Sequence, residues 1–134
     1  MTSLLDTDVI LRFLTADTNH KYKNLCSFFG SIETGDVRVE LKLIVLFQVI
    51  FVLQGYYKVP REKITDGLLK LISYKGMMIK EKKLVRRSLE LWRDNNHIEI
   101  VDCYLIACLE GDDKNILYSD DRGFGKFNIN RIEP

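Results

Sequence analysis

The chain has 134 residues, 46% of them apolar and 29% charged, which is the balance of a globular domain and excludes a largely disordered chain. With 20 Lys and Arg against 19 Asp and Glu, the formal net charge is +1, so no general basic field attracts nucleic acid or anionic lipid. Three cysteines without a C-x-x-C pair argue against a disulfide framework or a zinc knuckle. We expect one domain over residues 1–134, in the reducing cytoplasm and without a membrane span.

The first half of the chain alternates short apolar segments with helical stripes. Residues 3–6 predict a strand, and apolar side chains at helical spacing from 9 to 14 predict a helix directly after it. A second stripe at 25–32 predicts the next helix, and the β-prone residues 37–41 predict the next strand. The evenly apolar run 44–53 is long enough to favour a buried helix over a strand.

The second half continues the same alternation. Pro60 is a suitable helix start, and Asp102 is expected to cap a short later helix. Helices are expected at 60–72, 84–94 and 102–109, and strands at 115–119 and, weakly, 129–132. Strands separated by helices predict parallel pairing, and therefore an α/β fold in which helix exceeds strand.

Three aspartates are candidates for a shared site. Asp6 follows the first predicted strand and Asp121 follows the strand 115–119, so both are expected at the carboxyl edge of one parallel sheet. Asp102 stands among apolar neighbours, where an unpaired carboxylate is unfavourable. Three carboxylates together would repel one another, and Mg²⁺ or Mn²⁺ relieves that repulsion. Taken singly, each aspartate also fits a helix cap or a turn.

Four segments, in this order, resemble a known family. They are LLDTDV near the start, LFQVIFVLQGYYKVPREKI in the middle, IVDCYLIACL later and LYSDDRGF near the end. Together they resemble the PIN domain, particularly the VapC-type toxin ribonucleases, over essentially the whole chain. The resemblance implies a three-layer α/β/α sandwich with a short central parallel sheet. It also implies cleavage of RNA phosphodiester bonds that depends on Mg²⁺ or Mn²⁺.

The resemblance assigns roles to residues by position. Asp6, Asp102 and Asp121 correspond to metal-binding aspartates, and Ser119 corresponds to the small hydroxyl residue that precedes the last of them. Asp8, where the family often has Asn, is expected to support Asp6. The resemblance also implies a homodimer held inactive by a small antitoxin protein.

Two positions depart from the family pattern, and both lose negative charge. Gln48 stands where the family usually has a glutamate. Gly123 stands two residues after Asp121, where the family often has an acidic residue. A glutamine oxygen can still ligate a cation, but three carboxylates bind a divalent metal less tightly than four, which predicts weakened activity. Other acids that could substitute are Glu40, Glu99 and Asp120, and the sequence does not choose among them.

Two arginines are candidates for contact with the substrate. Arg12 and Arg122 stand near the aspartates and are expected to bind RNA phosphate, although either could instead pair with an acid. His97 lacks partners at zinc spacing and is not expected to be a ligand.

The alternative function is a non-catalytic PIN-like module that binds RNA or a protein. A third and weaker hypothesis is another phosphoryl-transfer enzyme.

Overall fold

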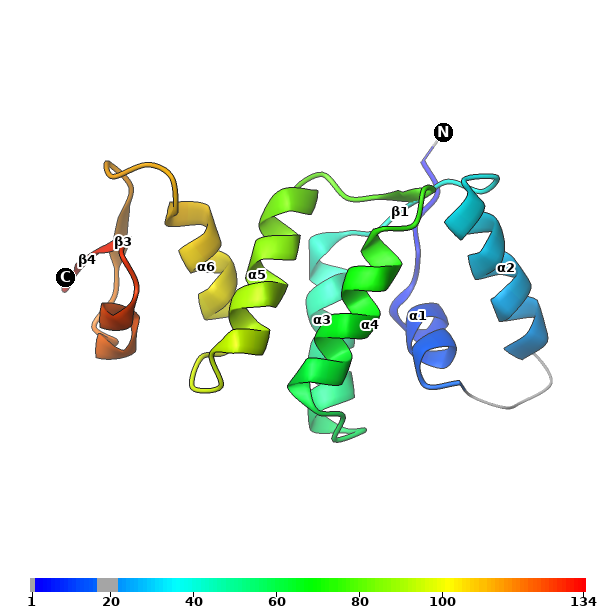
Figure 1. Ribbon diagram of the computed structural model, residues 1–134, viewed down its shortest axis with the longest axis horizontal. Helices are drawn as coiled ribbons and strands as arrows, with labels where there is room; N and C mark the ends of the chain where they lie inside the picture. The colour runs from blue at the N-terminus through cyan, green and yellow to red at the C-terminus, as the bar shows by residue number, and fades with distance from the viewer. Residues whose placement is uncertain (1, 17–21) are drawn as a thin grey trace. The chain divides into compact units, whose positions relative to one another are not determined.

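The computed structural model describes residues 2–16 and 22–134 (Figure 1). Within these ranges the chain forms six α-helices, one short 3-10 helix and four strands of two or three residues. It divides into two compact units, Met1–Lys82 and Lys83–Pro134, each with its own small sheet. Both sheets are parallel, so the described residues form a mixed α/β structure in which helix exceeds strand, as the sequence predicts.

Helices make up most of the first unit. Its described helices are α1 (Thr7–Leu14), α2 (Tyr22–Thr34), α3 (Leu43–Gly55) and α4 (Arg61–Ile72). Asp6 is the N-cap of α1, because its side chain accepts a hydrogen bond from the Thr7 N–H. Pro60 is the N-cap of α4, at the helix start that the sequence predicts, where a missing N–H breaks no helical hydrogen bond. These four helices lie where the apolar stripes of the sequence place them.

The sheet of the first unit is smaller than the sequence suggests. Strands β1 (Val39–Glu40) and β2 (Met77–Met78) pair in parallel, and the predicted first strand is reduced to a bridge between Leu4 and Glu40. Gly76 comes directly before β2, and a Cβ atom there would lie 2.0 Å from the carbonyl oxygen of Val37. Only glycine therefore allows the two backbones to approach as closely as they do.

The core of the first unit includes a stacked pair of aromatic rings from two of its helices. The rings of Phe13 on α1 and Phe29 on α2 stack with centroids 4.1 Å apart, and Phe29 is fully buried. The other fully buried side chains of this core include Ile10, Ile32, Leu46, Val49, Ile50, Leu68 and Ile72. Because α1, α3 and α4 contribute to one core, the start of α1 and the exposed side of α3 hold fixed positions in this unit.

The second unit contains two helices and a parallel strand pair. Its elements are α5 (Lys82–Asp94), α6 (Ile100–Leu109), β3 (Ile116–Tyr118), the 3-10 helix η1 (Arg122–Lys126) and β4 (Asn130–Ile132). Ile116 pairs with Asn130 and Tyr118 pairs with Ile132. The predicted strands at 115–119 and 129–132 are therefore present in shortened form.

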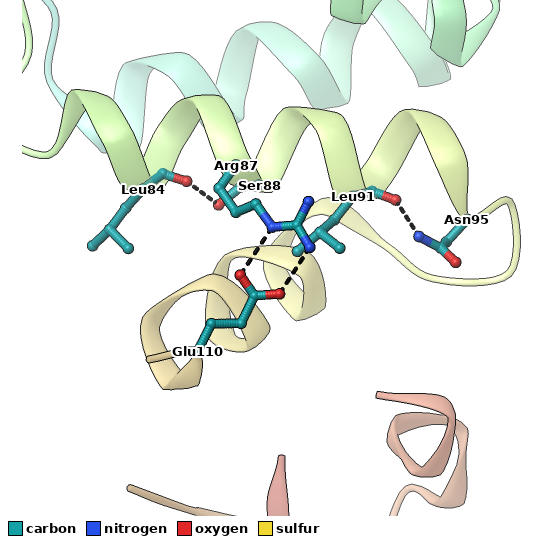
Figure 2. Close-up of polar contacts among 6 residues, drawn as sticks. All are labelled: Leu84, Arg87, Ser88, Leu91, Asn95 and Glu110. Carbon is teal, nitrogen blue, oxygen red and sulfur yellow. Dashed lines mark hydrogen bonds and ion pairs between the residues drawn. The ribbon is translucent and has the colours of Figure 1, made fainter. Parts of the chain in front are cut away.

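A bidentate ion pair connects α5 to α6. The Nε and Nη2 atoms of Arg87 each donate a 2.9 Å hydrogen bond to a carboxylate oxygen of Glu110 (Figure 2). On α5 the Ser88 hydroxyl donates to the Leu84 carbonyl, and the side-chain amide of Asn95, directly after the helix, donates to the Leu91 carbonyl. These bonds satisfy polar groups on α5 next to its buried apolar side chains.

One predicted helix start is wrong by three residues. The N-cap of α6 is Glu99, and Asp102 lies in the first turn instead of at the cap. The carboxylate of Asp102 accepts a hydrogen bond from the Glu99 N–H, which is the reciprocal half of a capping box. Asp102 therefore does stabilise the start of the helix, but from within its first turn.

The described helices are short relative to the thickness of a bilayer. The longest have 13 residues, and none in residues 2–16 and 22–134 combines the length and apolar character that crossing a membrane requires.

Candidate functional site

The residues singled out by the sequence fall into both units. Asp6, Asp8, Arg12 and Gln48 lie in the first unit, and the remaining residues, Asp102, Ser119, Asp121 and Arg122, lie in the second. Each group has its own local geometry, held by the elements of its own unit.

Asp102 and Asp121 come together in the second unit. Both line one small hollow of about 60 Å³, with Asp102 on α6 and Asp121 at the start of η1. Asp102 is half-buried and Asp121 is exposed. The other lining residues are His97, Ile98, Gly123 and Phe124. Two carboxylates from separate elements thus share a small pocket of mixed polar and apolar lining that opens to solvent.

The surroundings of Asp102 disfavour its negative charge. Partial burial raises the pKa of its carboxyl, and the nearby carboxylates of Asp121 and Glu99 raise it further. The hydrogen bond from the Glu99 N–H lowers this pKa but does not reverse the net increase. A cation between Asp102 and Asp121 would remove the repulsion and favour the ionised form of both.

A short loop fixes the carboxylate of Asp121. The backbone N–H of Asp121 donates to the Ser119 hydroxyl at 3.0 Å, and Asp121 Oδ1 accepts from the Gly123 N–H at 2.8 Å. The Ser119 carbonyl accepts a 2.8 Å hydrogen bond from Arg131, which attaches the loop to β4. One Asp121 oxygen is thus held by the loop, and the other is left for a ligand.

The geometry of this loop gives a physical reason for Gly123. A Cβ atom at this position would lie 3.0 Å from Asp121 Oδ1, closer than ordinary side-chain contacts. Gly123 therefore lets the Asp121 carboxylate approach the backbone at the start of η1. An acidic side chain at position 123, which the resemblance would lead one to expect, would compete for the space that Asp121 occupies here.

His97 is a residue of this pocket that sequence reasoning did not select. It lies in the segment before α6, is exposed, and lines the same hollow as Asp102 and Asp121. Motif spacing alone does not detect it, because His97 has no Cys or Asp at the separation typical of metal ligands. Its position adds an imidazole to the groups that can contact a ligand in the pocket.

In the first unit, Asp6 and Gln48 are connected through Thr7. Asp6 Oδ1 accepts the Thr7 N–H at 2.8 Å, and the Thr7 hydroxyl donates to Gln48 Oε1 at 2.6 Å. Asp6 and Gln48 are both exposed, whereas the Thr7 side chain is buried. Residues 41 positions apart in the chain are thereby joined at the start of α1.

The remaining candidates are exposed side chains near these groups. Asp8 lies in the first turn of α1, where its negative charge interacts favourably with the positive end of the helix dipole. Arg12, on the next turn, borders a mainly apolar hollow of about 360 Å³ between α1 and α2. Arg122 is the first residue of η1, directly after Asp121. Both arginines are thus open to an anionic ligand.

Neither unit, in its described residues, contains a complete protein cage for a metal. No three His, Cys, Asp or Glu side chains of one unit gather closely enough there to bind an ion together. The Asp102 and Asp121 pair still suits Mg²⁺, which is usually bound by one or two carboxylates and completes its shell with water and substrate phosphate.

A second hollow in the same unit is larger, at about 520 Å³, but contains none of the predicted residues. Its lining is polar and includes Glu110, Asp112 and Asp113. Asp112 uses its carboxylate to accept the Lys114 N–H within a turn. The carboxylates of Glu110 and Asp112 thus have local structural partners, and Asp112 serves as a control outside the Asp102 and Asp121 pocket.

Comparisons with known proteins add no assignment. No family model matches the chain, and no curated protein matches it. The likeness to PIN domains therefore rests on the four sequence segments alone.

Proposed function

We propose that the protein is an Mg²⁺- or Mn²⁺-dependent ribonuclease of the PIN type, related to the VapC toxins. The observation that carries the proposal is the pocket of the second unit, where Asp102 and Asp121 face a common space and the charge of Asp121 raises the pKa of Asp102. Such a pair is stabilised by a hard divalent cation. In this proposal Asp6 supplies the third carboxylate, and Asp8 and Ser119 support the metal-binding residues.

The proposed fold is a single domain over residues 1–134, with three α/β/α layers around a short parallel sheet. Parallel pairing in both described sheets supports it, because the central sheet of such a sandwich is parallel. The helices that separate paired strands support it further, since parallel strands need a crossover connection.

The chemistry proposed for the chain uses carboxylates and arginines in separate roles. When bound, the cation would supply charge neutralisation at the phosphate and an activated water for hydrolysis. Asp102 and Asp121 would hold it, and the Gly123 N–H fixes one oxygen of Asp121 in place. Arg122 would bind a phosphate oxygen, since it is exposed directly beside Asp121, and Arg12 would bind a further phosphate. Single-stranded RNA is the substrate class that fits an open site best.

Cleavage of a labelled single-stranded RNA in Mn²⁺ or Mg²⁺ tests the proposal. We expect activity in wild type and its loss in Asp6→Asn, Asp102→Asn and Asp121→Asn, because each change removes a negative charge that holds the cation. Asp112→Asn is the matched control, since Asp112 lies outside the Asp102 and Asp121 pocket. Unchanged cleavage by Asp6→Asn would remove the hypothesis, and so would equal loss in the control.

The alternative is a non-catalytic PIN-like module that binds RNA or a protein. It is favoured by the neutral amide at position 48, which brings no negative charge to a metal site and whose oxygen already accepts the Thr7 hydroxyl. This alternative predicts no turnover by purified wild type in either metal. Gln48→Glu separates the two functions: an increase in metal affinity and activity would identify the missing carboxylate as the limiting feature of an enzyme.

The same proposal includes protein partners and a location. A small antitoxin and a second copy of the chain are proposed as partners, and the reducing cytoplasm is the proposed compartment. Exposed apolar side chains on α6, Val101 and Leu105, are spaced one turn apart, as on surfaces that a protein partner covers. Light scattering of the purified chain tests the proposed homodimer.

A further inference from the structure

A hollow of about 370 Å³ in the first unit is lined by the ends of α1 and α3 and by the first half of α4. Most of its lining is apolar and comes from Leu14, Leu53, Val59 and Ile64. Leu53 and Ile64 are also buried in the core of the unit, so core packing fixes the floor of the hollow. Sites for small molecules are typically apolar hollows of about 300 to 1,000 Å³ that carry a few polar groups.

The loop between α3 and α4 forms one wall of the hollow and is held against α3. The Val59 N–H donates to the Leu53 carbonyl at 2.9 Å, and the Tyr57 N–H donates to the Val52 carbonyl at 3.2 Å. Lys58, between Tyr57 and Val59, has a left-handed φ of 55°, which is uncommon for a residue other than glycine. With this turn, Tyr57 and Val59 both line the hollow and Lys58 does not. The wall is therefore formed before any ligand binds.

Gly67 keeps the hollow open on the side of α4. It lies inside the helix, where glycine is less favourable than alanine. Among the described residues, a Cβ atom there would approach only Leu14 Cδ2, at 3.9 Å, which is an ordinary contact. The packing of the described chain thus does not require glycine at this position. The less favourable helix residue coincides with the space that a ligand would fill.

Lys63 is the only charged residue among the described residues that line the hollow. It is exposed and forms no ion pair with another described residue. The nearest acids of the same helix, Glu62 and Asp66, do not line the hollow. Tyr57 adds an aromatic ring and a hydroxyl, and is 46% exposed. One positive charge beside an apolar floor favours a ligand with an apolar body and one negative charge.

We propose that this hollow binds an amphipathic monocarboxylate such as a medium-chain fatty acid. The apolar chain lies against Leu53 and Ile64, and the carboxylate pairs with the Lys63 ammonium. A phosphate monoester brings nearly two negative charges to a single cation and is a poorer match. The hollow contains none of the residues assigned to the metal or to RNA, so this site goes beyond the proposed nuclease function and does not depend on it.

Titration with octanoate tests the proposal, and 1-octanol and octylammonium are comparison probes with the same chain and a different charge. Isothermal titration calorimetry measures the three affinities, and an amide NMR spectrum locates the binding site. We expect octanoate to bind more tightly than octanol, and octylammonium to bind most weakly, because Lys63 attracts only the carboxylate. The amide signals of Leu53, Val59 and Gly67 should shift when octanoate is added.

Lys63→Met removes the charge and keeps the length of the side chain. We expect the affinity for octanoate to fall about 2- to 5-fold, as for loss of an exposed ion pair, and the affinity for octanol to stay unchanged. Lys70→Met is the matched control, since Lys70 is an exposed lysine of the same helix outside the hollow. An unchanged octanoate affinity in Lys63→Met, or an equal loss for octanol, would overturn the pairing of the carboxylate with Lys63.

Gly67→Leu fills the hollow and should weaken binding of octanoate and octanol about 10-fold or more, which corresponds to about two buried methylene groups. Gly30→Leu, on α2, is the matched control, because nothing described lies within 4 Å of a Cβ atom there. Circular dichroism verifies that both variants fold, and the Lys63→Met comparison decides the proposal if Gly67→Leu does not. Wild-type octanoate affinity in folded Gly67→Leu would overturn the proposal. Absence of octanoate binding by wild type, or amide shifts confined to residues outside the hollow, would overturn it as well.

Discussion

The carboxylate of Asp121 faces the same hollow as that of Asp102 and raises the pKa of Asp102. The two aspartates reach this pocket from a helix and from a loop that follows a strand, so neither is fixed by its neighbours in sequence alone. Burial is the larger cause of the raised pKa, and the repulsion between the two charges adds to it. This relationship can be measured before any substrate or metal is identified.

Asp121→Asn should lower the pKa of Asp102 in the metal-free protein. The change removes the negative charge that opposes ionisation of Asp102, while partial burial and the Glu99 carboxylate still hold this pKa above the ordinary 3.8. A ¹³C NMR titration of the Asp102 side-chain carboxyl in EDTA measures the shift. Asp120→Asn is the control, since Asp120 is not among the causes of the raised pKa. An unchanged Asp102 titration would show that the two carboxylates do not interact.

The contribution of Asp102 to the stability of the metal-free protein should fall as pH rises through the titration of this group. The pKa of Asp102 is raised in the folded state, so the folded chain binds more protons than the unfolded chain in this range, and ionisation favours unfolding. The loss begins near the ordinary value of 3.8 and is complete once the raised pKa has been passed. Because Asp102 is partly exposed, we expect an effect below about 1 kcal/mol.

Asp102→Asn provides the comparison for this pH dependence. In urea unfolding with EDTA, the free energy of unfolding of the variant should lack the decrease that ionisation of Asp102 causes in wild type. The stability of the variant relative to wild type should therefore increase between acidic and neutral pH. Added Mn²⁺ should then stabilise wild type more than Asp102→Asn, because a ligand of the folded state raises its stability. A difference between the two proteins that does not change with pH would contradict the assigned cause.

The elements of this protein differ in how far the sequence determines them. Apolar stripes predict helices because they depend on residues three or four positions apart, and Pro60 is a local helix signal. The strand Met77–Met78 was not predicted, because it has two residues and depends on the close approach of Gly76 to Val37. The first predicted strand is reduced to one bridge, because its pairing depends on Glu40, far along the chain.

The candidate site shows the same division. The motif order selects Asp102 and Asp121, and the structure brings these two into one pocket. Sequence spacing did not select His97, whose place in that pocket depends on how the segment before α6 folds. The bond between Thr7 and Gln48 also escaped prediction, because α1 and α3 must pack before the two side chains meet. Whether Asp6 acts with the pair in the second unit stays a prediction.

Gly123→Ala should weaken Mn²⁺ binding about 10-fold, the lower end of the effect of removing a contact that orients a metal ligand. The added Cβ atom would lie 3.0 Å from Asp121 Oδ1, so the carboxylate must move and its hydrogen bond from the Gly123 N–H is weakened. Isothermal titration calorimetry measures the affinity. Gly125→Ala is the matched control, since nothing lies within 4 Å of a Cβ atom there. Equal affinities in both variants would show that Gly123 does not set the position of Asp121.

The ion pair between Arg87 and Glu110 should stabilise the second unit by about 0.2 to 1 kcal/mol, the range measured for exposed pairs. Its bidentate geometry favours the upper part of this range, with both hydrogen bonds at 2.9 Å (Figure 2). A double-mutant cycle with Arg87→Ala and Glu110→Ala, followed by urea unfolding, isolates the coupling energy. Arg86→Ala combined with Glu110→Ala is the control cycle and should show no coupling, because the hydrogen bonds to Glu110 come from Arg87. Raising the salt concentration should reduce the coupling energy only modestly, since the two charges are in direct contact. A coupling energy near zero would show that the pair orients α5 and α6 without stabilising the unit.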